Sequence, residues 1–242
     1  MDIHGYFLCY NEEAILPHLL KHYLSFCDKV TILDNESTDS SVEIVRSFKN
    51  TDVISWNSGN QVRDDLYLEL KNNVWKASKS KCDYVIVGDA DEFIYHPEIL
   101  HFLDDSKKKG YTLFKPEGYY MIADENYELS PSSNLLKEVT KGISGSANQK
   151  PMVFSPSIQE INFLPGCHSA SPIGNVKTNY WNLKLLHYKY LGLKDFIPKQ
   201  LERGKRLSEF NKKNGYGMYY LYDEGTHRKE YKTFIERRDY VI

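Results

Sequence analysis

The first half of the chain alternates short apolar runs with segments of helical periodicity, and this alternation limits the fold most strongly. The apolar runs are 5–10, 29–33, 53–56 and 84–87. The helical patterns between and after them cover about 15–24, 42–48, 62–79 and 97–110. This order predicts an α/β fold with a mixed, mostly parallel central sheet that is flanked by helices.

Composition excludes several other classes of protein. With 242 residues, the chain has room for one large domain or two small ones. Hydrophobic residues make up 41% and charged residues 26%, which is not the composition of a disordered chain. The net charge of −2 gives no indication of nucleic-acid binding.

Location is inferred from cysteine spacing and from the first residues. The four cysteines form no CxxC pair, which favours a reducing compartment over a disulfide scaffold or a zinc site. The sequence contains no apolar run of about 20 residues, and its start lacks the basic region of a signal peptide. We therefore expect a cytoplasmic protein.

Polar residues follow three of the four predicted strands. They are Asn11-Glu12, Asp34-Asn35 and Asp89-Ala90-Asp91. Because parallel strands direct their carboxyl ends to one edge, these side chains should gather there and form a ligand site.

The Asp89-Ala90-Asp91 segment carries the clearest chemistry. In extended backbone, residues i and i+2 point to the same side, so the two carboxylates could hold Mg²⁺ or Mn²⁺ together with phosphate oxygens. The alternative is that they cap a turn. Residues 34–39 also have two possible roles: they could contact a ribose or a base, or they could cap the next helix.

The second half is less regular. We expect a strand at 111–122, a long polar loop at 123–149, and strand-like pieces at 152–155, 158–163 and 181–188. A basic helix should cover about 193–214, followed by a glycine- and tyrosine-rich stretch at 215–222. Either the 123–149 loop or the tyrosine-rich tail is expected to close the site.

Three motifs in order carry a resemblance to a known family. The segments CYNEE, ILDNESTDSS and VIVGDADEF resemble the GT-A fold glycosyltransferases, specifically family 2-like bacterial enzymes of the DxDEF type. The resemblance covers residues 3–110 and continues more weakly through His187 and Arg203. It implies a single glycosyltransferase domain over 1–242, with a nucleotide-sugar-binding half (1–110) and an acceptor-side half (111–242) that holds the C-terminal helices.

The resemblance also implies site residues and a cofactor. The residues implied in nucleotide-sugar binding are Tyr10, Asn11, Glu12, Asp34, Asn35, Ser37, Asp65, Asp89 and Arg203. The residues implied as ligands of a divalent cation, Mn²⁺ or Mg²⁺, are Asp89, Asp91 and His187. Without the resemblance, a lone histidine such as His187 is more often structural. His168 is a second candidate, for contact with the acceptor or the metal, and the structural reading is favoured there as well.

The catalytic residues are less clearly marked. Asp91 is implied by the DxD motif, and Asp124 and Glu125 are the nearest carboxylates that could act as base. Glu117 and Glu160 follow behind them. No Glu-Asp pair of the kind found in the family stands in this region.

Arg203 lies in the segment QLERG, a partial match to the QxxRW motif of processive synthases. Gly204 replaces the tryptophan, which disfavours a processive synthase. Basic residues of this helix could bind a diphosphate, contact anionic lipid headgroups or form a solvated face.

The function predicted from these features is a metal-dependent, non-processive glycosyltransferase of cell-surface polysaccharide biosynthesis. It would move a hexose from a nucleotide diphosphate sugar, expected to be a UDP-sugar, to a hydroxyl of a glycan or glycolipid, with inversion. The expected partners are this donor, the acceptor and the inner face of the membrane, through peripheral contact by the basic helix. An inactive sugar- or nucleotide-binding protein is one alternative. A sugar nucleotidyltransferase is less favoured, because residues 9–13 contain no glycine.

Overall fold

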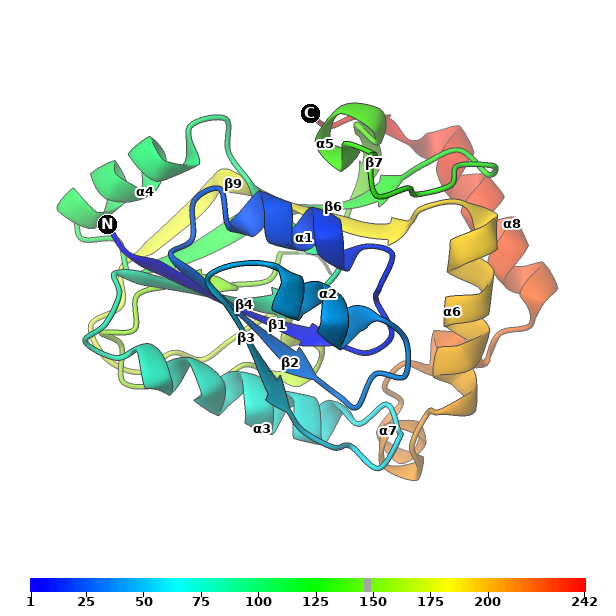
Figure 1. The fold of residues 1–242 in the computed structure, drawn as a ribbon, viewed down its shortest axis with the longest axis horizontal. Helices are drawn as coiled ribbons and strands as arrows, with labels where there is room; N and C mark the ends of the chain where they lie inside the picture. Colours follow the sequence, from blue (N-terminus) through cyan, green and yellow to red (C-terminus); the bar gives the residue numbers. More distant parts are fainter. Residues whose placement is uncertain (146–148) are drawn as a thin grey trace.

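Four parallel strands form the centre of the sheet, in the spatial order β3-β2-β1-β4. Their bounds are β1 (Ile3–Cys9), β2 (Lys29–Asp34), β3 (Thr51–Ser55) and β4 (Tyr84–Asp89). The computed structural model describes residues 1–145 and 149–242 (Figure 1). β1, β2 and β4 are almost wholly buried, as their continuous apolar runs predict.

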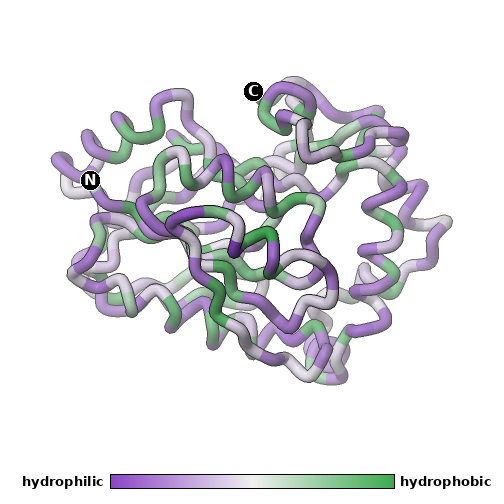
Figure 2. Tube along the Cα trace, in the orientation of Figure 1, coloured by the Kyte–Doolittle hydropathy of each residue, from purple (hydrophilic) through white to green (hydrophobic). Residues whose placement is uncertain are grey.

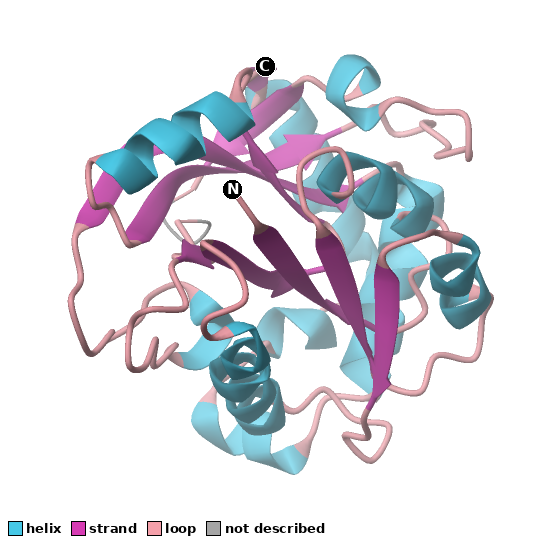
Figure 3. Ribbon diagram, turned by 60° about the vertical axis from the view of Figure 1, so that its left-hand side comes forward, coloured by secondary structure: helices cyan, strands magenta, loops and turns pink. Residues whose placement is uncertain are grey.

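The connecting helices lie where the sequence places them. They are α1 (Leu16–Tyr23), α2 (Ser41–Ser47), α3 (Asp64–Asn73), the 3₁₀ helix η1 (Val74–Ser78) and α4 (Ile99–Lys108). Helix α1 begins with Pro17 in its first turn, where a missing N–H is tolerated, and buries Leu16, Leu19, Leu20 and Tyr23. Figure 3 shows helices on both sides of the strands.

The second half extends this sheet with mainly antiparallel pairs. The strands are β5 (Glu92–Tyr95), β6 (Leu113–Ile122), β7 (Lys141–Ser144), β8 (Val153–Phe154), β9 (Thr178–Tyr190) and β10 (Asp239–Tyr240). Strand β8 pairs with both β4 and β6, while β9 runs parallel to β6 and antiparallel to β5. The predicted fold class, α/β with a mixed sheet flanked by helices, is confirmed.

The remaining helices are α5 (Leu135–Glu138), η3 (Pro165–Cys167), α6 (Leu193–Lys205), α7 (Glu209–Asn214), η4 (Met218–Leu221) and α8 (Glu224–Arg237). The prediction of one helix over 193–214 is wrong, because the helix is interrupted at residues 206–208, between α6 and α7. Leu207 pairs with Val62 as an isolated parallel bridge. Ser208 then caps α7 by accepting a hydrogen bond from the Asn211 N–H at 3.1 Å.

Two other local predictions need correction. The segment 158–163 forms no strand and makes only isolated bridges through Glu160 and Phe163. The predicted loop at 123–149 contains α5 and β7, and its residues 146–148 lie outside the described part of the chain.

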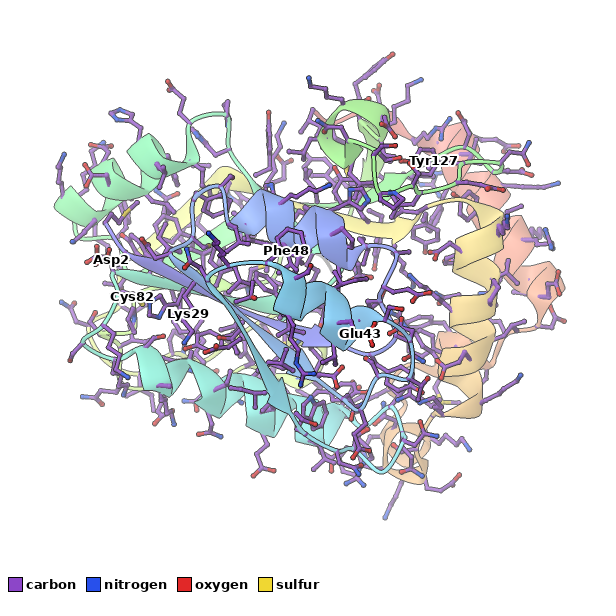
Figure 4. The ribbon with its side chains drawn as sticks, in the orientation of Figure 1. Asp2, Lys29, Glu43, Phe48, Cys82 and Tyr127 are labelled. Carbon is purple, nitrogen blue, oxygen red and sulfur yellow. The ribbon has the colours of Figure 1, made fainter. Side chains whose placement is uncertain are left out.

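Hydrophobic segments gather in the central strands, and the outer turns are hydrophilic (Figure 2). Phe48, labelled in Figure 4, follows α2 and packs against this core. Across the described ranges, no helix has the length and apolar character needed to span a membrane.

Candidate active site

A cavity of about 690 Å³ opens at the carboxyl ends of β1 and β4. Residues of α3, β9, α6 and the segment 215–220 complete its walls. Figure 1 shows α6 standing across this end of the sheet. Asp2, Lys29 and Cys82 lie together at the opposite edge, where the strands begin (Figure 4). The cavity therefore lies at the predicted edge of the sheet.

Asp89 and Asp91 both line this cavity, but they have different partners. Asp89 accepts hydrogen bonds from the ammonium groups of Lys71, at 2.5 Å, and Lys150, at 3.3 Å. Asp91 lies 3.3 Å from Nε2 of His187. Burial opposes ionisation of both carboxylates. Lys71 and Lys150 nevertheless hold the pKa of Asp89 below its ordinary value, and the contact with His187 together with the charges of Arg203 and Lys199 does the same for Asp91.

Glu92 fixes the turn from behind. Its side chain is fully buried, its Oε2 accepts a hydrogen bond from the Asp89 N–H at 3.0 Å, and its Oε1 lies 2.5 Å from Nζ of Lys150. A Cβ at position 88 would lie 3.2 Å from Oε2 of Glu92, so Gly88 leaves room for this carboxylate. The carboxylate of Glu92 thus supports the turn that presents Asp89 and Asp91.

The predicted cation ligands are only partly brought together. Asp91 and His187 fit a cation site, since their 3.3 Å separation is close to the spacing of about 3 Å between neighbouring octahedral ligands at bonds of about 2.1 Å. Nδ1 of His187 faces Oε1 of Glu92 at 4.0 Å, where a supporting carboxylate would be expected. Asp89 is turned to its lysines instead. Residues 1–145 and 149–242 contain no group of three His, Cys, Asp or Glu side chains that could hold a metal.

The turn after β1 connects the cavity to α6. Glu12 is buried, and its carboxylate lies 2.9 Å from Nζ of Lys199 and 3.4 Å from Nη2 of Arg203. Burial alone would lower the pKa of Lys199. The neighbouring Glu12 and Asp195 carboxylates outweigh this effect and raise the pKa above its ordinary value, so Lys199 stays charged. Lys199 and Arg203 both line the cavity, so they do not belong to a solvated basic face.

Tyr10 and Asn11 also line the cavity. The guanidinium carbon of Arg206 lies 3.3 Å from the centroid of the Tyr10 ring. Asn11 has a positive φ of 51°, and its Oδ1 accepts a hydrogen bond from the Thr38 N–H at 2.7 Å. This contact joins the turn after β1 to the turn after β2.

The turn after β2 contributes one of its three predicted residues to the cavity. Asn35 lines it and exchanges hydrogen bonds with Ser58. Asp34 is buried and accepts the Ser37 N–H at 3.3 Å, while Ser37 Oγ accepts the Asn11 N–H at 2.9 Å. Neither Asp34 nor Ser37 is part of the cavity wall, so both shape the turn.

Asp65 lies outside the wall, where Arg63 holds its carboxylate with two hydrogen bonds. Its neighbour Asp64 lines the cavity instead and accepts a hydrogen bond from Asn211 at 3.0 Å. Burial raises the pKa of Asp64.

The two carboxylates predicted as bases do not reach the cavity. Asp124 is exposed and pairs with Arg238. The backbone carbonyl of Glu125 accepts a hydrogen bond from the Leu193 N–H, and its side chain is not in the wall.

Of the two segments expected to close the site, the described residues of 123–149 contribute nothing to the wall, whereas 215–220 does. His168 lines the cavity.

Sequence reasoning missed several residues of the wall. Asp64, Tyr67 and Lys71 share one face of α3 at a spacing of three and four residues, a pattern that could have been found. Lys189 follows His187 by two residues and so shares its side of β9. Lys150 has no local signal, because β4 and β8 must pair before it reaches Asp89.

The fold and cavity define an α/β protein with a charged ligand site at the carboxyl edge of its sheet. No known family model matches the sequence, and no curated protein matches it. Solved structures give weak matches. Residues 1–349 of S. aureus TarS in complex with UDP-GlcNAc are 15% identical, with a TM-score of 0.46, over 85% of this chain and 66% of that chain.

Two further structures show the range of these matches. A longer S. aureus TarS structure is 14% identical, with a TM-score of 0.46, over 85% of this chain and 39% of that chain. Glucosyl-3-phosphoglycerate synthase from Mycobacterium tuberculosis, in complex with Mn²⁺, UDP and glucosyl-3-phosphoglycerate, is 19% identical, with a TM-score of 0.34, over 48% of this chain and 44% of that chain. These values are too low to indicate an activity.

Proposed function

We propose that this protein is a GT-A type glycosyltransferase that takes a hexose from a nucleotide diphosphate sugar. One observation carries the proposal: Asp91, paired with His187, faces the same cavity as the Tyr10–Glu12 turn and the cation Arg203. The Tyr10–Glu12 turn belongs to the CYNEE motif, and Asp91 belongs to the VIVGDADEF motif. We infer a UDP-sugar as donor and inversion at the sugar from the family resemblance.

The wall divides into parts with different tasks. Tyr10, Asn11 and Asn35 offer an aromatic ring and amide groups to the nucleoside. Lys199 and Arg203 offer charged N–H donors to a diphosphate, which binds such donors strongly. The Glu12 carboxylate keeps both cations aimed at the cavity.

Asp91 and His187 would hold a Mn²⁺ or Mg²⁺ ion. When bound, such an ion neutralises negative charge on the departing nucleoside diphosphate. Asp89, held by two lysines, instead keeps the turn in place. The glycan or glycolipid acceptor, the cytoplasmic location and the peripheral membrane contact remain proposals. Asp124 and Glu125 receive no role.

A thermal-shift screen tests the proposal. UDP, GDP and dTDP are added with and without Mn²⁺ to the wild type, to Asp91→Asn and to Asp104→Asn, a half-exposed control on α4 that lies outside the cavity wall. We expect one nucleotide to raise the Tm of the wild type and of the control, with the shift lost in Asp91→Asn. If all three nucleotides fail on the wild type, the donor site is wrong.

Donor hydrolysis separates the enzyme from an inactive binding protein. An enzyme releases free sugar slowly from its nucleotide sugar even without acceptor, and Mn²⁺ increases the rate. Saturable nucleotide binding without any sugar release would favour the binding protein.

A further inference from the structure

Lys189 places an ammonium group among tyrosine rings on the cavity wall. It lies on β9 two residues after His187, so both side chains point to the same side of the strand, and both line the cavity. Its Nζ is 4.5 Å from the ring centroid of Tyr219, 5.9 Å from that of Tyr220 and 6.0 Å from that of Tyr120. These three tyrosines also line the cavity and form an aromatic cage around the ammonium.

The other lysines of the wall have carboxylate partners. Lys71 and Lys150 pair with Asp89, and Lys199 pairs with Glu12. Lys189 differs from them. In the parts of the chain that the structure describes, no carboxylate forms an ion pair with it and no group accepts a hydrogen bond from it. Ring faces replace only part of the hydration that a cation loses. An anion entering the cavity would therefore find an uncommitted donor.

The position of Lys189 separates it from the nucleotide side. Tyr10, Asn11 and Asn35 follow β1 and β2, toward one edge of the sheet. Lys189 lies on β9, which pairs with β6 and β5 beyond β4, and Tyr120 belongs to β6. Asp91 lies between these two sides. A group bound at Lys189 would lie across the reacting centre from the nucleoside.

We propose that Lys189 and its aromatic cage form a subsite for an acceptor that carries a carboxylate or a phosphate group. This inference rests on the proposed glycosyl transfer and names its acceptor class. The ammonium supplies a charge-assisted hydrogen bond to the anionic group, and the tyrosine faces pack against the apolar face of the acceptor ring. A neutral acceptor offers the ammonium only hydroxyl oxygens, which accept hydrogen bonds but do not compensate its charge.

Three sugars test this subsite: glucose 6-phosphate, glucuronate and methyl glucoside. Each is titrated by isothermal calorimetry or ligand-observed NMR into the wild type, Lys189→Met, Lys189→Arg and Lys194→Met, with and without UDP. Lys194 is the control, because its side chain lies on α6 and is 78% exposed. We expect the wild type and the control to bind at least one anionic sugar about tenfold or more tightly than methyl glucoside.

Lys189→Met should lose this preference, and Lys189→Arg should keep part of it. The two anionic sugars distinguish a phosphate from a carboxylate. Equal binding of all three sugars by the wild type, no binding of any, or a preference that survives in Lys189→Met would each overturn the subsite. If Lys189→Met does not fold, the wild-type preference and Lys189→Arg decide.

The nucleotide arm keeps this test separate from the proposed function. A wild type that UDP, GDP and dTDP fail to stabilise contradicts the donor site. A wild type that responds to a nucleotide but binds anionic and neutral sugars equally contradicts the acceptor subsite alone.

Discussion

Nζ of Lys71 lies 2.5 Å from Oδ1 of Asp89, joining helix α3 to the end of β4 inside the cavity wall. The side chain of Lys71 is 5% exposed. Lys150 approaches the second oxygen of the same carboxylate at 3.3 Å and also contacts Glu92. The first aspartate of the DxD motif is thus part of a buried ionic network.

This network predicts a large effect of Lys71→Met on stability. Removing one partner of a buried pair leaves part of the carboxylate charge uncompensated, and Lys150 offsets some of that loss. We expect the free energy of unfolding to fall by about 3 kcal/mol in urea titrations. Lys76→Met, which removes a half-exposed pair with Glu160, should cost about 1 kcal/mol or less. Equal losses for the two variants would contradict the buried network.

Acid should destabilise the protein through Asp89 and Asp91. Their pKa values are lowered in the folded state, so the unfolded chain binds more protons near pH 4. Their stabilising contribution is full above the unfolded pKa of about 3.9 and is lost as the pH falls toward the folded pKa. Urea midpoints measured from about pH 6 to pH 3 should decrease, and the decrease should be smaller in Asp91→Asn. The exposed control Glu43→Gln should show the same decrease as the wild type. If the urea midpoint of Asp91→Asn falls with pH as steeply as that of the wild type, Asp91 does not contribute to the acid sensitivity.

His187→Gln should weaken cation binding. It removes one of the two side chains that fit a cation, so Mn²⁺ affinity in the presence of UDP should fall by about tenfold or more. Electron paramagnetic resonance of free Mn²⁺ measures this directly. His101→Gln, on the exposed face of α4, is the matched histidine control. Unchanged Mn²⁺ binding in His187→Gln would show that the ion is held elsewhere.

Glu12→Gln should loosen α6 from the cavity. The amide cannot balance the charges of Lys199 and Arg203, and we expect a loss of about 2 kcal/mol in the free energy of unfolding. The nucleotide-induced rise in Tm should also shrink, because the two cations lose their fixed position. Glu13→Gln changes an exposed neighbour and should cost less than about 1 kcal/mol. The prediction fails if both substitutions behave alike.

The cap at Ser208 should stabilise the break between α6 and α7. Ser208→Ala removes the acceptor of the Asn211 N–H and should cost about 1 kcal/mol. Ser40 stands at the same position of α2 without a side-chain cap hydrogen bond, so Ser40→Ala should have little effect. Thermal or urea unfolding of both variants provides the comparison.

The regular elements of residues 1–110 were predictable because their patterns are local. Buried parallel strands give continuous apolar runs, and a helix such as α1 repeats its buried positions every three to four residues. Strand β5 was missed because a two-residue turn separates it from β4, and its four residues are too few for periodicity. The break at Leu207 was missed because its cause is a bridge to Val62, far away in the sequence.

The site divides in the same way. The regular elements of residues 1–110 and the edge at which Glu12, Asp89 and Asp91 meet could be predicted, because short-range periodicity and the order of strands can be read along the chain. The partners of these carboxylates could not be predicted in this way, since Lys71, Lys150, His187 and Lys199 come from separate parts of the chain. Ionic contacts act through space over a few ångströms, and no spacing along the chain encodes which charges folding will bring within that distance.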